Sequence, residues 1–409
     1  MKYIQDWGFT LCISFGENGE DCPYRSCYNG GMKSLTILGS TGSIGTQALD
    51  IVRNRPADFK VLGLSAGKNF ELLVDQIKEF KPSFVTILSD KNKTELKSLF
   101  PELEVLKDIK ELASQKADIT LSGIVGIAGL EANLEALKNS KRVAVANKET
   151  LVVAGHIVKD YCKKYGSELI PVDSEHAAIH QCLANAKDSE VQEIILSSSG
   201  GPFREFSKED LKNVSLEQAL NHPTWKMGPK ITIDSSTLMN KALEIIEASV
   251  LFELDYDRIK VVIHPQSIVH SAVKFIDGTS LAQMGTPNMC VPIQYALDYP
   301  EKKLLAVEDN FDLSEISSLE FFKPDFDKFP ALNLAYKVGR EGGSMPTAFN
   351  AANEAAVELF LGAKIAYLDI YSIIEKSVEA HKPIESPSLE QILSLDKDIK
   401  NEIRTAVLV

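Results

Sequence analysis

The chain has 409 residues, of which 44% are hydrophobic and 25% are charged, and its formal net charge is −13. This composition is typical of a globular protein and too hydrophobic for a disordered one. The negative charge disfavours binding to nucleic acid or anionic lipid, and the sequence lacks the run of about 18 apolar residues that a membrane span requires. We expect a cytoplasmic protein of two or three domains that acts on a small molecule.

Residues 1–31 differ from the rest of the chain. They contain Cys12, Cys22 and Cys27, three of the six cysteines, and show no clear periodicity. A secretory signal is not predicted because the apolar run at 9–15 follows an acidic residue and lacks a small-residue cleavage site, and several acidic residues argue against a transit peptide. Two neighbouring thiols are too few for a closed zinc site. We expect this segment to be an extension outside the folded core.

From Lys33 onward, short apolar runs alternate with amphipathic segments. Strands are predicted at 34–38, 60–65, 84–88, 119–121, 142–146 and 169–172, and the first helices at 44–52 and 70–80. Such alternation indicates βαβ units and a parallel sheet covered on both faces. The sequence therefore predicts a Rossmann-like, doubly wound α/β domain over 32–173.

The pattern changes after Asp173. Strands of an antiparallel-leaning sheet are predicted at 191–197, 259–263, 267–275 and 279–284, and helices at 237–252, 289–298, 332–340, 348–361, 365–380 and 389–407. These elements predict a central α+β catalytic domain with a flexible flap over 174–298, a linker over 299–329 and a C-terminal helical domain over 330–409.

A glycine-rich turn, Gly39-Ser-Thr-Gly42-Ser-Ile-Gly45, joins the first predicted strand to the first helix. Glycines at this junction allow a sharp turn, and the helix N-terminus offers free N–H groups to a pyrophosphate. The GxxGxxG spacing is one residue away from the dinucleotide fingerprint, so its position in the βα unit carries the interpretation. A glycine-rich turn without a ligand is the alternative.

The second strand is followed by Lys68 instead of the acidic residue that NAD-selective sites use to bind the ribose 2′-hydroxyl. Ser65 and Lys68 would accommodate a 2′-phosphate, which favours NADPH over NADH. A solvated loop lysine is the alternative.

Polar residues also follow two later strands. Lys148 and Glu149 come after the strand at 142–146, and Asp173 and Glu175 come after the strand at 169–172. Ligands bind at the carboxyl ends of parallel strands, and oxygen ligands favour Mg²⁺ or Mn²⁺ over zinc. The alternatives are a surface lysine and an acidic helix N-terminus that complements the helix dipole.

The segment 234–244 adds a third polar group. Ser235 or Ser236 is predicted to cap the helix that follows. Asn240 and Glu244 are four residues apart and Lys241 and Glu244 three apart, so their side chains share a helix face. Hydroxyl, amide and ammonium groups suit a phosphate, and Glu244 would complete a three-carboxylate metal site. A surface salt bridge is the alternative.

Two further segments suggest a flap that closes over a ligand. Gly200 and Gly201 follow Ser199 and would permit loop movement, and Trp225 would exclude water. His222 lies in the same segment as Trp225. A structural histidine and a core tryptophan are the alternatives.

Together these motifs resemble the 1-deoxy-D-xylulose 5-phosphate reductoisomerase family of the non-mevalonate isoprenoid pathway, from about residue 33 to the C-terminus. The matching strings are GSTGSIG at 39–45, AGKN at 66–69, ANKE at 146–149, PVDSEH at 171–176, SGGPFRE at 199–205, HPTWKMG at 222–228, DSSTLMNKALEIIEA at 234–248, IHPQSIVHS at 263–271 and NAANE at 350–354. The segment 1–31 is the one clear departure from this family.

The resemblance implies a role for each matching residue. NADPH is expected at Thr41, Gly42, Ser43, Ile44, Gly67, Lys68, Asn69, Asn147, Glu149 and Gly228. Mg²⁺ or Mn²⁺, with Co²⁺ as a substitute, is expected at Asp173, Glu175 and Glu244. The sugar phosphate substrate is expected at Lys148, Ser174, Glu175, Ser199, His222, Trp225, Ser235, Asn240, Lys241 and Glu244, with Met227 in the flap. Lys148, Glu175 and His222 are the expected catalytic residues.

The resemblance also implies the reaction and a homodimer. The family rearranges 1-deoxy-D-xylulose 5-phosphate and reduces the product with NADPH to 2-C-methyl-D-erythritol 4-phosphate, with the metal acting as a Lewis acid. One alternative is an NADP-dependent dehydrogenase that does not isomerise its substrate and needs no metal. Another is a binding or scaffold protein, which predicts the loss of at least one ligand, yet Asp173, Glu175, Lys241 and Glu244 are all present.

Overall fold

The computed structural model describes residues 31–225, 227–308 and 311–408. The extension expected at 1–31 therefore lies, apart from Gly31, outside the described residues, as do its three cysteines. No helix of the described segments combines the length and the hydropathy that a transmembrane segment requires.

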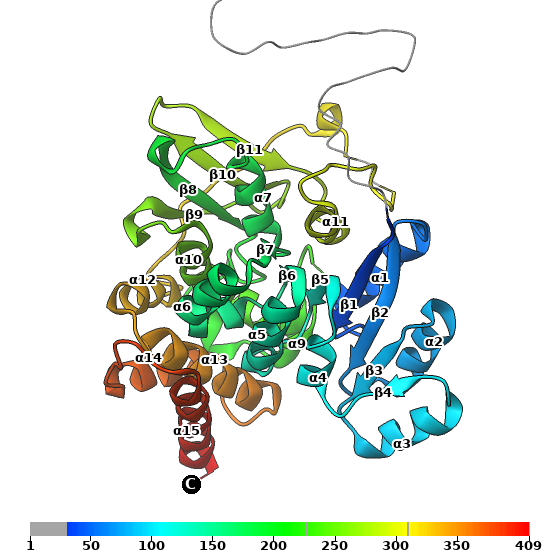
Figure 1. The fold of residues 1–409 in the computed structure, drawn as a ribbon. Helices are drawn as coiled ribbons and strands as arrows, with labels where there is room; N and C mark the ends of the chain where they lie inside the picture. Colours follow the sequence, from blue (N-terminus) through cyan, green and yellow to red (C-terminus); the bar gives the residue numbers. More distant parts are fainter. Residues whose placement is uncertain (1–30, 226, 309–310, 409) are drawn as a thin grey trace, which may run out of the picture.

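A seven-stranded parallel sheet forms the N-terminal part of the molecule (Figure 1). Its strands are β1 (Lys33–Leu38), β2 (Phe59–Ala66), β3 (Phe84–Ile87), β4 (Glu104–Val105), β5 (Ala117–Ser122), β6 (Ser140–Val145) and β7 (Glu168–Pro171). The order β4-β3-β2-β1-β5-β6-β7 places the reversal of strand order between β1 and β5. Ligands of doubly wound sheets bind at such a switch point.

Helices alternate with these strands in the chain. They are α1 (Ser43–Asn54), α2 (Phe70–Phe80), α3 (Asp90–Leu99), α4 (Ile109–Ala113), α5 (Leu130–Asn139), α6 (Lys148–Tyr165) and α7 (Ser174–Cys182). Strands β1, β2 and β5 bury most of their side chains because helices cover both faces of a parallel sheet. The predicted Rossmann-like α/β architecture is confirmed.

A second, four-stranded sheet has the order β11-β10-β8-β9. Its strands are β8 (Val191–Ser198), β9 (Ile259–Ile263), β10 (Val269–Phe275) and β11 (Ser280–Met284). Strand β10 runs antiparallel to both β8 and β11, while β8 and β9 are parallel, as expected for a mixed sheet. Helix α7 packs against β10 and β11 and so joins this sheet to the end of β7.

The helix predicted at 237–252 is α10 (Met239–Phe252), and a further helix that was not predicted, α9 (Pro229–Ser236), precedes it. Pro229 starts α9 because a proline is favourable at the first helical position. The chain then turns at Leu238, whose φ of 57° lies in the left-handed region. The prediction that Ser235 or Ser236 caps the later helix is wrong, since both residues belong to the last turn of α9.

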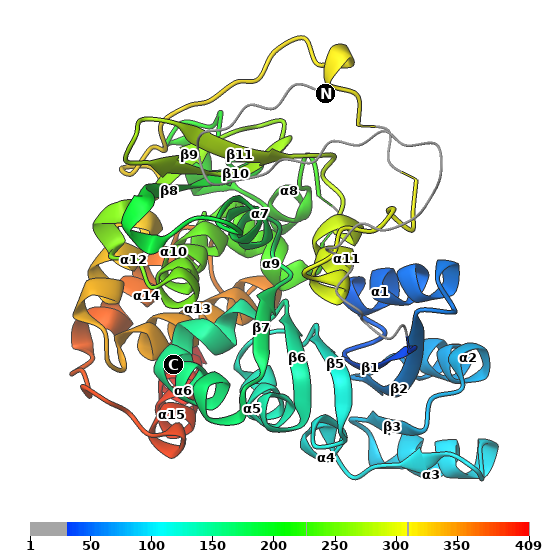
Figure 2. The same ribbon diagram turned by 45° about the horizontal axis from the view of Figure 1, so that its top comes forward.

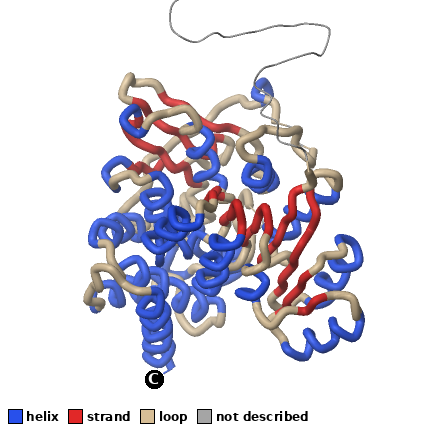
Figure 3. Tube along the Cα trace, viewed as in Figure 1, coloured by secondary structure: helices blue, strands red, loops and turns tan. Residues whose placement is uncertain are grey.

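The remaining helices are α8 (Leu216–Leu220), α11 (Cys290–Asp298), α12 (Ala331–Glu341), α13 (Met345–Leu361), α14 (Asp369–Ala380) and α15 (Leu389–Leu408). Short 3-10 turns occur at Ile127–Gly129, Asp188–Glu190, Asp210–Asn213, Tyr256–Arg258 and Leu313–Glu315. Helix α13 is rich in buried alanine, which allows α14, α15 and α6 to pack closely around it. The helices gather beside the two sheets in Figure 3, and Figure 2 shows α11 beside α1.

Candidate active site

The glycine-rich turn after β1 depends on close backbone approach. Gly39 has a φ of 90°, which favours glycine, and a Cβ at Gly45 would lie 2.4 Å from the carbonyl oxygen of Gly39. Gly42 precedes α1, and no side chain caps the helix there. The first N–H groups of α1 therefore remain available to an anion.

The end of β2 supports this turn. The Ser65 hydroxyl accepts a hydrogen bond from the Gly39 N–H at 2.8 Å, and the Ser65 carbonyl accepts one from the Ser40 N–H at 2.7 Å. Asn69 caps α2 by accepting from the Leu72 N–H at 3.2 Å, and Lys68 is exposed beside it. Ser65 thus holds the turn, and Lys68 remains the candidate for a 2′-phosphate.

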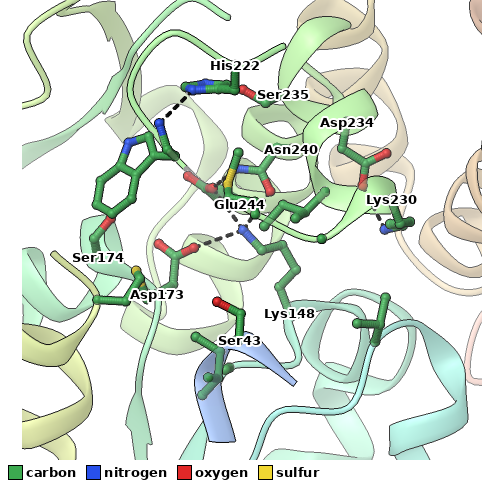
Figure 4. Close-up of a pocket in the computed structure, with 18 of the residues that line it drawn as sticks. Ser43, Lys148, Asp173, Ser174, His222, Lys230, Asp234, Ser235, Asn240 and Glu244 are labelled. Atoms are coloured by element: carbon green, nitrogen blue, oxygen red, sulfur yellow. Dashed lines mark hydrogen bonds and ion pairs between the residues drawn. The ribbon is translucent and has the colours of Figure 1, made fainter. Parts of the chain in front are cut away.

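A cavity of about 600 Å³ opens between this turn, α7, α9 and α10 (Figure 4). The predicted site residues that line it are Gly42, Ser43, Ile44, Lys148, Glu149, Asp173, Ser174, Glu175, Ser199, His222, Trp225, Met227, Gly228, Ser235, Asn240, Lys241 and Glu244. The predicted residues outside its lining are Thr41, Gly67, Lys68, Asn69 and Asn147. Thr41 belongs to the turn itself, Gly67, Lys68 and Asn69 follow β2, whose Ser65 contacts the turn, and Asn147 is buried.

Lys148 joins three elements at the floor of the cavity. Its Nζ atom donates hydrogen bonds to Asp173 Oδ2 at 2.8 Å, Asn240 Oδ1 at 2.8 Å and Glu244 Oε1 at 2.9 Å. Lys148 begins α6, Asp173 caps α7 and the other two residues lie on α10. All three donors of the ammonium group are therefore satisfied by contacts within the protein.

A second ammonium group links the remaining carboxylate. Lys241 Nζ lies 2.6 Å from Glu175 Oε1 and also pairs with Glu244 Oε2. Asp173 and Glu244 offer ligand atoms that lie, with one from His176, within 4.8 Å of one another. Glu175 is outside that group and is connected to it through Lys241.

The electrostatics of this cluster favour an added cation. Burial and the charge of Glu244 raise the pKa of Glu175 to about 7. Burial alone would also raise the pKa of Asp173, but Lys148 and His176 lower it well below its ordinary value. Glu175 therefore holds its negative charge less readily than an exposed carboxylate, and a cation placed beside it would favour its ionised form. Its oxygen donors suit Mg²⁺ or Mn²⁺.

The sequence interpretation did not include His176, although it closes the PVDSEH string. The ring is buried, with Nδ1 3.0 Å from Asp173 Oδ1 and Nε2 3.1 Å from the Glu244 carbonyl oxygen. Burial alone would lower its pKa, but Glu247 and Asp173 raise it to about 9. Its position three residues after Asp173, the N-cap of α7, was the sequence signal that could have placed it beside the carboxylates.

Lys230 was also absent from the predicted site. It lies at the start of α9 and lines the cavity, and its Nζ atom is 2.7 Å from both Glu149 Oε1 and Asp234 Oδ2. Asn147 donates to Glu149 Oε2 at 3.0 Å and to the Gly126 carbonyl oxygen at 2.9 Å. The Asn147 side chain is therefore occupied by contacts within the protein.

The proposed flap contributes a neutral histidine. His222 Nδ1 accepts hydrogen bonds from the N–H groups of Thr224 and Trp225 at 3.1 and 2.9 Å, so the ring proton is on Nε2. Nε2 lies 3.2 Å from the Ser199 hydroxyl, to which it donates. Burial lowers the pKa of His222 to about 4, and the ring is uncharged near pH 7.

The loop after Ser199 packs tightly onto α9. Gly201 has a φ of 69°, and a Cβ there would lie 2.6 Å from the Ser235 carbonyl oxygen. This contact brings the Ser199 and Ser235 segments together, and both residues line the same cavity as Asn240 and Lys241. The predicted phosphate-binding residues therefore share one cavity.

Comparison with known proteins gives the same family over most of the chain. Three family models match: 1-deoxy-D-xylulose 5-phosphate reductoisomerase over residues 35–155, its C-terminal domain over 169–252, and the DXP reductoisomerase C-terminal domain over 284–402. A 1-deoxy-D-xylulose 5-phosphate reductoisomerase of a Geobacillus species is 48% identical over 91% of this chain and all of its own length. That of Halalkalibacterium halodurans is 44% identical over 92% of this chain.

Solved structures agree. A DOX-P reductoisomerase in complex with NADPH, fosmidomycin and magnesium has a TM-score of 0.87 and 38% identity, covering 92% of this chain and 98% of its own. The Zymomonas mobilis 1-deoxy-D-xylulose 5-phosphate reductoisomerase in complex with NADPH has a TM-score of 0.85 and 37% identity with the same coverage. The chain belongs to the 1-deoxy-D-xylulose 5-phosphate reductoisomerase family.

Proposed function

We propose that the chain rearranges 1-deoxy-D-xylulose 5-phosphate and reduces the product to 2-C-methyl-D-erythritol 4-phosphate, using NADPH and a divalent metal ion. One observation carries this proposal: the lining of a single cavity includes the dinucleotide turn and the acidic residues Asp173, Glu175 and Glu244. A dehydrogenase that does not isomerise its substrate would need the turn but not the carboxylates.

The dinucleotide is proposed to bind from the turn toward Glu149. Gly42, Ser43 and Ile44 would receive the pyrophosphate at the N-terminus of α1. Lys68, exposed at the end of β2, would attract a 2′-phosphate and so select NADPH. Relatives solved in complex with NADPH support this choice.

Asp173, Glu175 and Glu244 are the proposed ligands of Mg²⁺ or Mn²⁺, and a related protein was solved with magnesium. Bound metal supplies Lewis acidity toward substrate oxygens. Lys148 and Lys241 neutralise these carboxylates through the contacts described above, and they would turn toward the substrate when it binds. Ser174, at the first position of α7, would contact the substrate beside them.

The substrate phosphate is proposed to bind between α10 and the flap. Ser199, Ser235, Asn240 and Lys241 offer hydroxyl, amide and ammonium donors to this cavity. His222 adds a neutral Nε2 donor, which binds the anion without carrying a proton to it. Trp225 and Met227 of the flap would exclude water from the reacting carbons.

A product assay tests the activity. Incubation with 1-deoxy-D-xylulose 5-phosphate, NADPH and Mn²⁺ should oxidise NADPH and yield 2-C-methyl-D-erythritol 4-phosphate, identified by mass spectrometry and NMR. EDTA should abolish both signals, and Mn²⁺ or Mg²⁺ should restore them, because the metal is required for the rearrangement. Reduction that persists in EDTA, or that leaves the carbon skeleton unbranched, would favour the simple dehydrogenase instead.

We infer further that the enzyme is a cytoplasmic homodimer. The resemblance to the family supports this inference, as does the exposed edge of the four-stranded sheet. There β11 carries Leu281, 53% exposed, and the adjoining turn carries Ile276, 67% exposed. Apolar side chains on an uncovered edge are typical of a surface that pairs with another chain. Light scattering after gel filtration would give a mass near 90 kDa for a dimer, twice the 45.0 kDa of the chain.

A further inference from the structure

Lys230 occupies an unusual position between the flap and the dinucleotide side of the cavity. It is the second residue of α9 and follows the flap segment 222–228 by one residue. Its ammonium group lies 2.7 Å from Glu149 on α6 and 2.7 Å from Asp234 one turn further along α9. The Lys230 side chain is 18% exposed, and those of Glu149 and Asp234 are 7% and 2% exposed.

The contacts continue on both sides of this triad. Glu149 uses its second oxygen to accept from Asn147, which also holds the loop carbonyl of Gly126. Asp234 uses its second oxygen to accept from Asn353 of α13 at 3.0 Å. Lys230 is thus the central member of a buried polar chain that connects the NADPH-binding domain, the end of the flap and the C-terminal helices. Figure 4 shows its pairing with Asp234.

The triad of Lys230, Glu149 and Asp234 contains one ammonium group and two carboxyl groups. Burial alone would lower the pKa of Lys230, but Asp234 and Glu149 raise it above its ordinary value. Burial raises the pKa of Asp234, whereas Lys230 lowers that of Glu149 against the effect of burial. The lysine is therefore the group that keeps Glu149 ionised. Removing it would leave a buried carboxylate without its counterion, which then has to turn or take up a proton.

We propose that Lys230 is a positioning residue that fixes the Glu149 carboxylate at the end of the cavity toward which the dinucleotide is proposed to extend, and that it anchors the flap where it enters α9. The proposal rests on the function proposed above. Glu149 cannot keep its orientation through Asn147 alone, because a single hydrogen bond leaves the other oxygen unpaired in a buried site. Lys230 acts on the cofactor through Glu149, and it acts on the flap by fixing the first turn of α9.

A double-mutant cycle tests this role by measuring the dissociation constant for NADPH by fluorescence, without substrate or metal. Lys230→Met should raise this constant about tenfold in the wild-type background, within the range seen for contacting residues. In a Glu149→Gln background the same substitution should change it less than about twofold, because the partner through which it acts is already neutral. A direct attraction between Lys230 and the dinucleotide would give equal effects in both backgrounds and would overturn the proposal.

A second buried ion pair, which lies away from the cavity, provides a control for the effect of lost stability on NADPH binding. Arg55 pairs with Asp298 at 2.6 Å, with side-chain exposures of 12% and 2%. Arg55→Met should lower the melting temperature as Lys230→Met does and leave NADPH binding unchanged. Lys230→Gln, which removes the charge and shortens the side chain but keeps it polar, substitutes for Lys230→Met if that variant does not fold, and the same tenfold change is expected. A dissociation constant that does not change in the variant used refutes the positioning role.

The flap gives an independent readout. Lys230→Met should raise the KM for 1-deoxy-D-xylulose 5-phosphate as well as lowering kcat, whereas Lys230→Arg, which keeps the charge, should restore most of both. Equal loss in the two variants would indicate a purely steric role and contradict the proposal. If the wild-type protein itself does not bind NADPH, the proposed function is wrong. That outcome differs from a wild-type protein that binds NADPH and Lys230 variants that bind it equally well, which would refute the positioning role alone.

Discussion

The two edges of the cavity, one proposed to bind the dinucleotide and the other proposed to bind the metal, are built from different parts of the chain. At the dinucleotide edge, the turn at 39–45 offers backbone N–H groups, and its shape depends on Gly39 and Gly45. At the metal edge, α7 and α10 offer charged side chains that are almost fully buried, among them Glu244 with no exposed surface. The shape of the first edge is determined by steric limits on the backbone, and that of the second by attraction between buried charges.

This difference indicates which substitutions should damage each edge. Backbone donors remain in place when side chains change, so the turn is sensitive to added volume at its glycines. The buried charges are mutually dependent, because each ammonium group serves two carboxylates. A substitution at the metal edge should therefore cost mainly activity, and one at the dinucleotide edge should cost stability and cofactor binding together.

The largest effect is expected for Glu244→Gln. The variant keeps the size of the side chain but removes a charge shared by Lys148 and Lys241, and it weakens the proposed metal site. We expect kcat/KM to fall about a thousandfold, equivalent to several kcal/mol of transition-state stabilisation. Calorimetric titration with Mn²⁺ should show weaker binding.

Glu253→Gln is the matched control for Glu244→Gln, since Glu253 ends the same helix in an exposed pair with Lys159. Its activity should remain within about twofold of wild type, as is usual for surface positions. Full activity of Glu244→Gln would show that activity does not depend on the buried charges at the metal edge.

A smaller effect is expected for Gly45→Ala. The added Cβ would lie 2.4 Å from the Gly39 carbonyl oxygen and 2.5 Å from Ser40 Cα, so the turn must shift. We expect a loss of about 1–3 kcal/mol in unfolding free energy, as for other overpacked sites, together with weaker NADPH binding. Urea unfolding and fluorescence titration measure the two quantities.

Gly67→Ala controls the stability measurement at the same edge. Apart from its chain neighbours, no heavy atom lies within 4 Å of the added Cβ, and the stability of this variant should stay within about 0.5 kcal/mol of wild type. Equal losses in the two glycine variants would show that the turn is not sterically tuned.

The smallest effect concerns His222 of the flap, which lines the same cavity. The folded-state pKa of His222 is about 4, below the ordinary value of 6.5, so the unfolded chain binds a proton first as the pH falls. Wild-type stability should therefore decline from about pH 6.5 toward pH 4 more steeply than that of His222→Gln. The difference should stay below about 2 kcal/mol because solvent screens the ring. Parallel slopes in melting temperature against pH would contradict the neutral histidine.

Much of the fold follows from local patterns. The strands of the parallel sheet are short apolar runs separated by amphipathic helices, and the glycine turn stands at the first junction between a strand and a helix. Both patterns reflect contacts near in sequence, and these are the contacts that periodicity and turn chemistry report. The same holds for Asn240, Lys241 and Glu244, which share one face of a single helix.

Helix α9 was not predicted, although α10 was. The segment 237–252 reads as one amphipathic helix with hydroxyl residues before it, and that pattern favours a capped N-terminus. Pro229 instead starts a helix that includes those hydroxyls and ends at Ser236, and the left-handed Leu238 separates it from α10. Packing of both helices against other parts of the chain outweighs the local preference.

By itself, the sequence determined the order of strands and helices, the steric need for glycine in the turn, and the spacing of the polar residues on α10. Only the tertiary structure decided that Lys148 meets Asp173 and Glu244, that Lys241 holds Glu175, and that Lys230 joins Glu149 to Asp234. These pairs connect residues from different elements, and the choice of counterion for a buried charge depends on which elements pack together. Sequence spacing carries no such information.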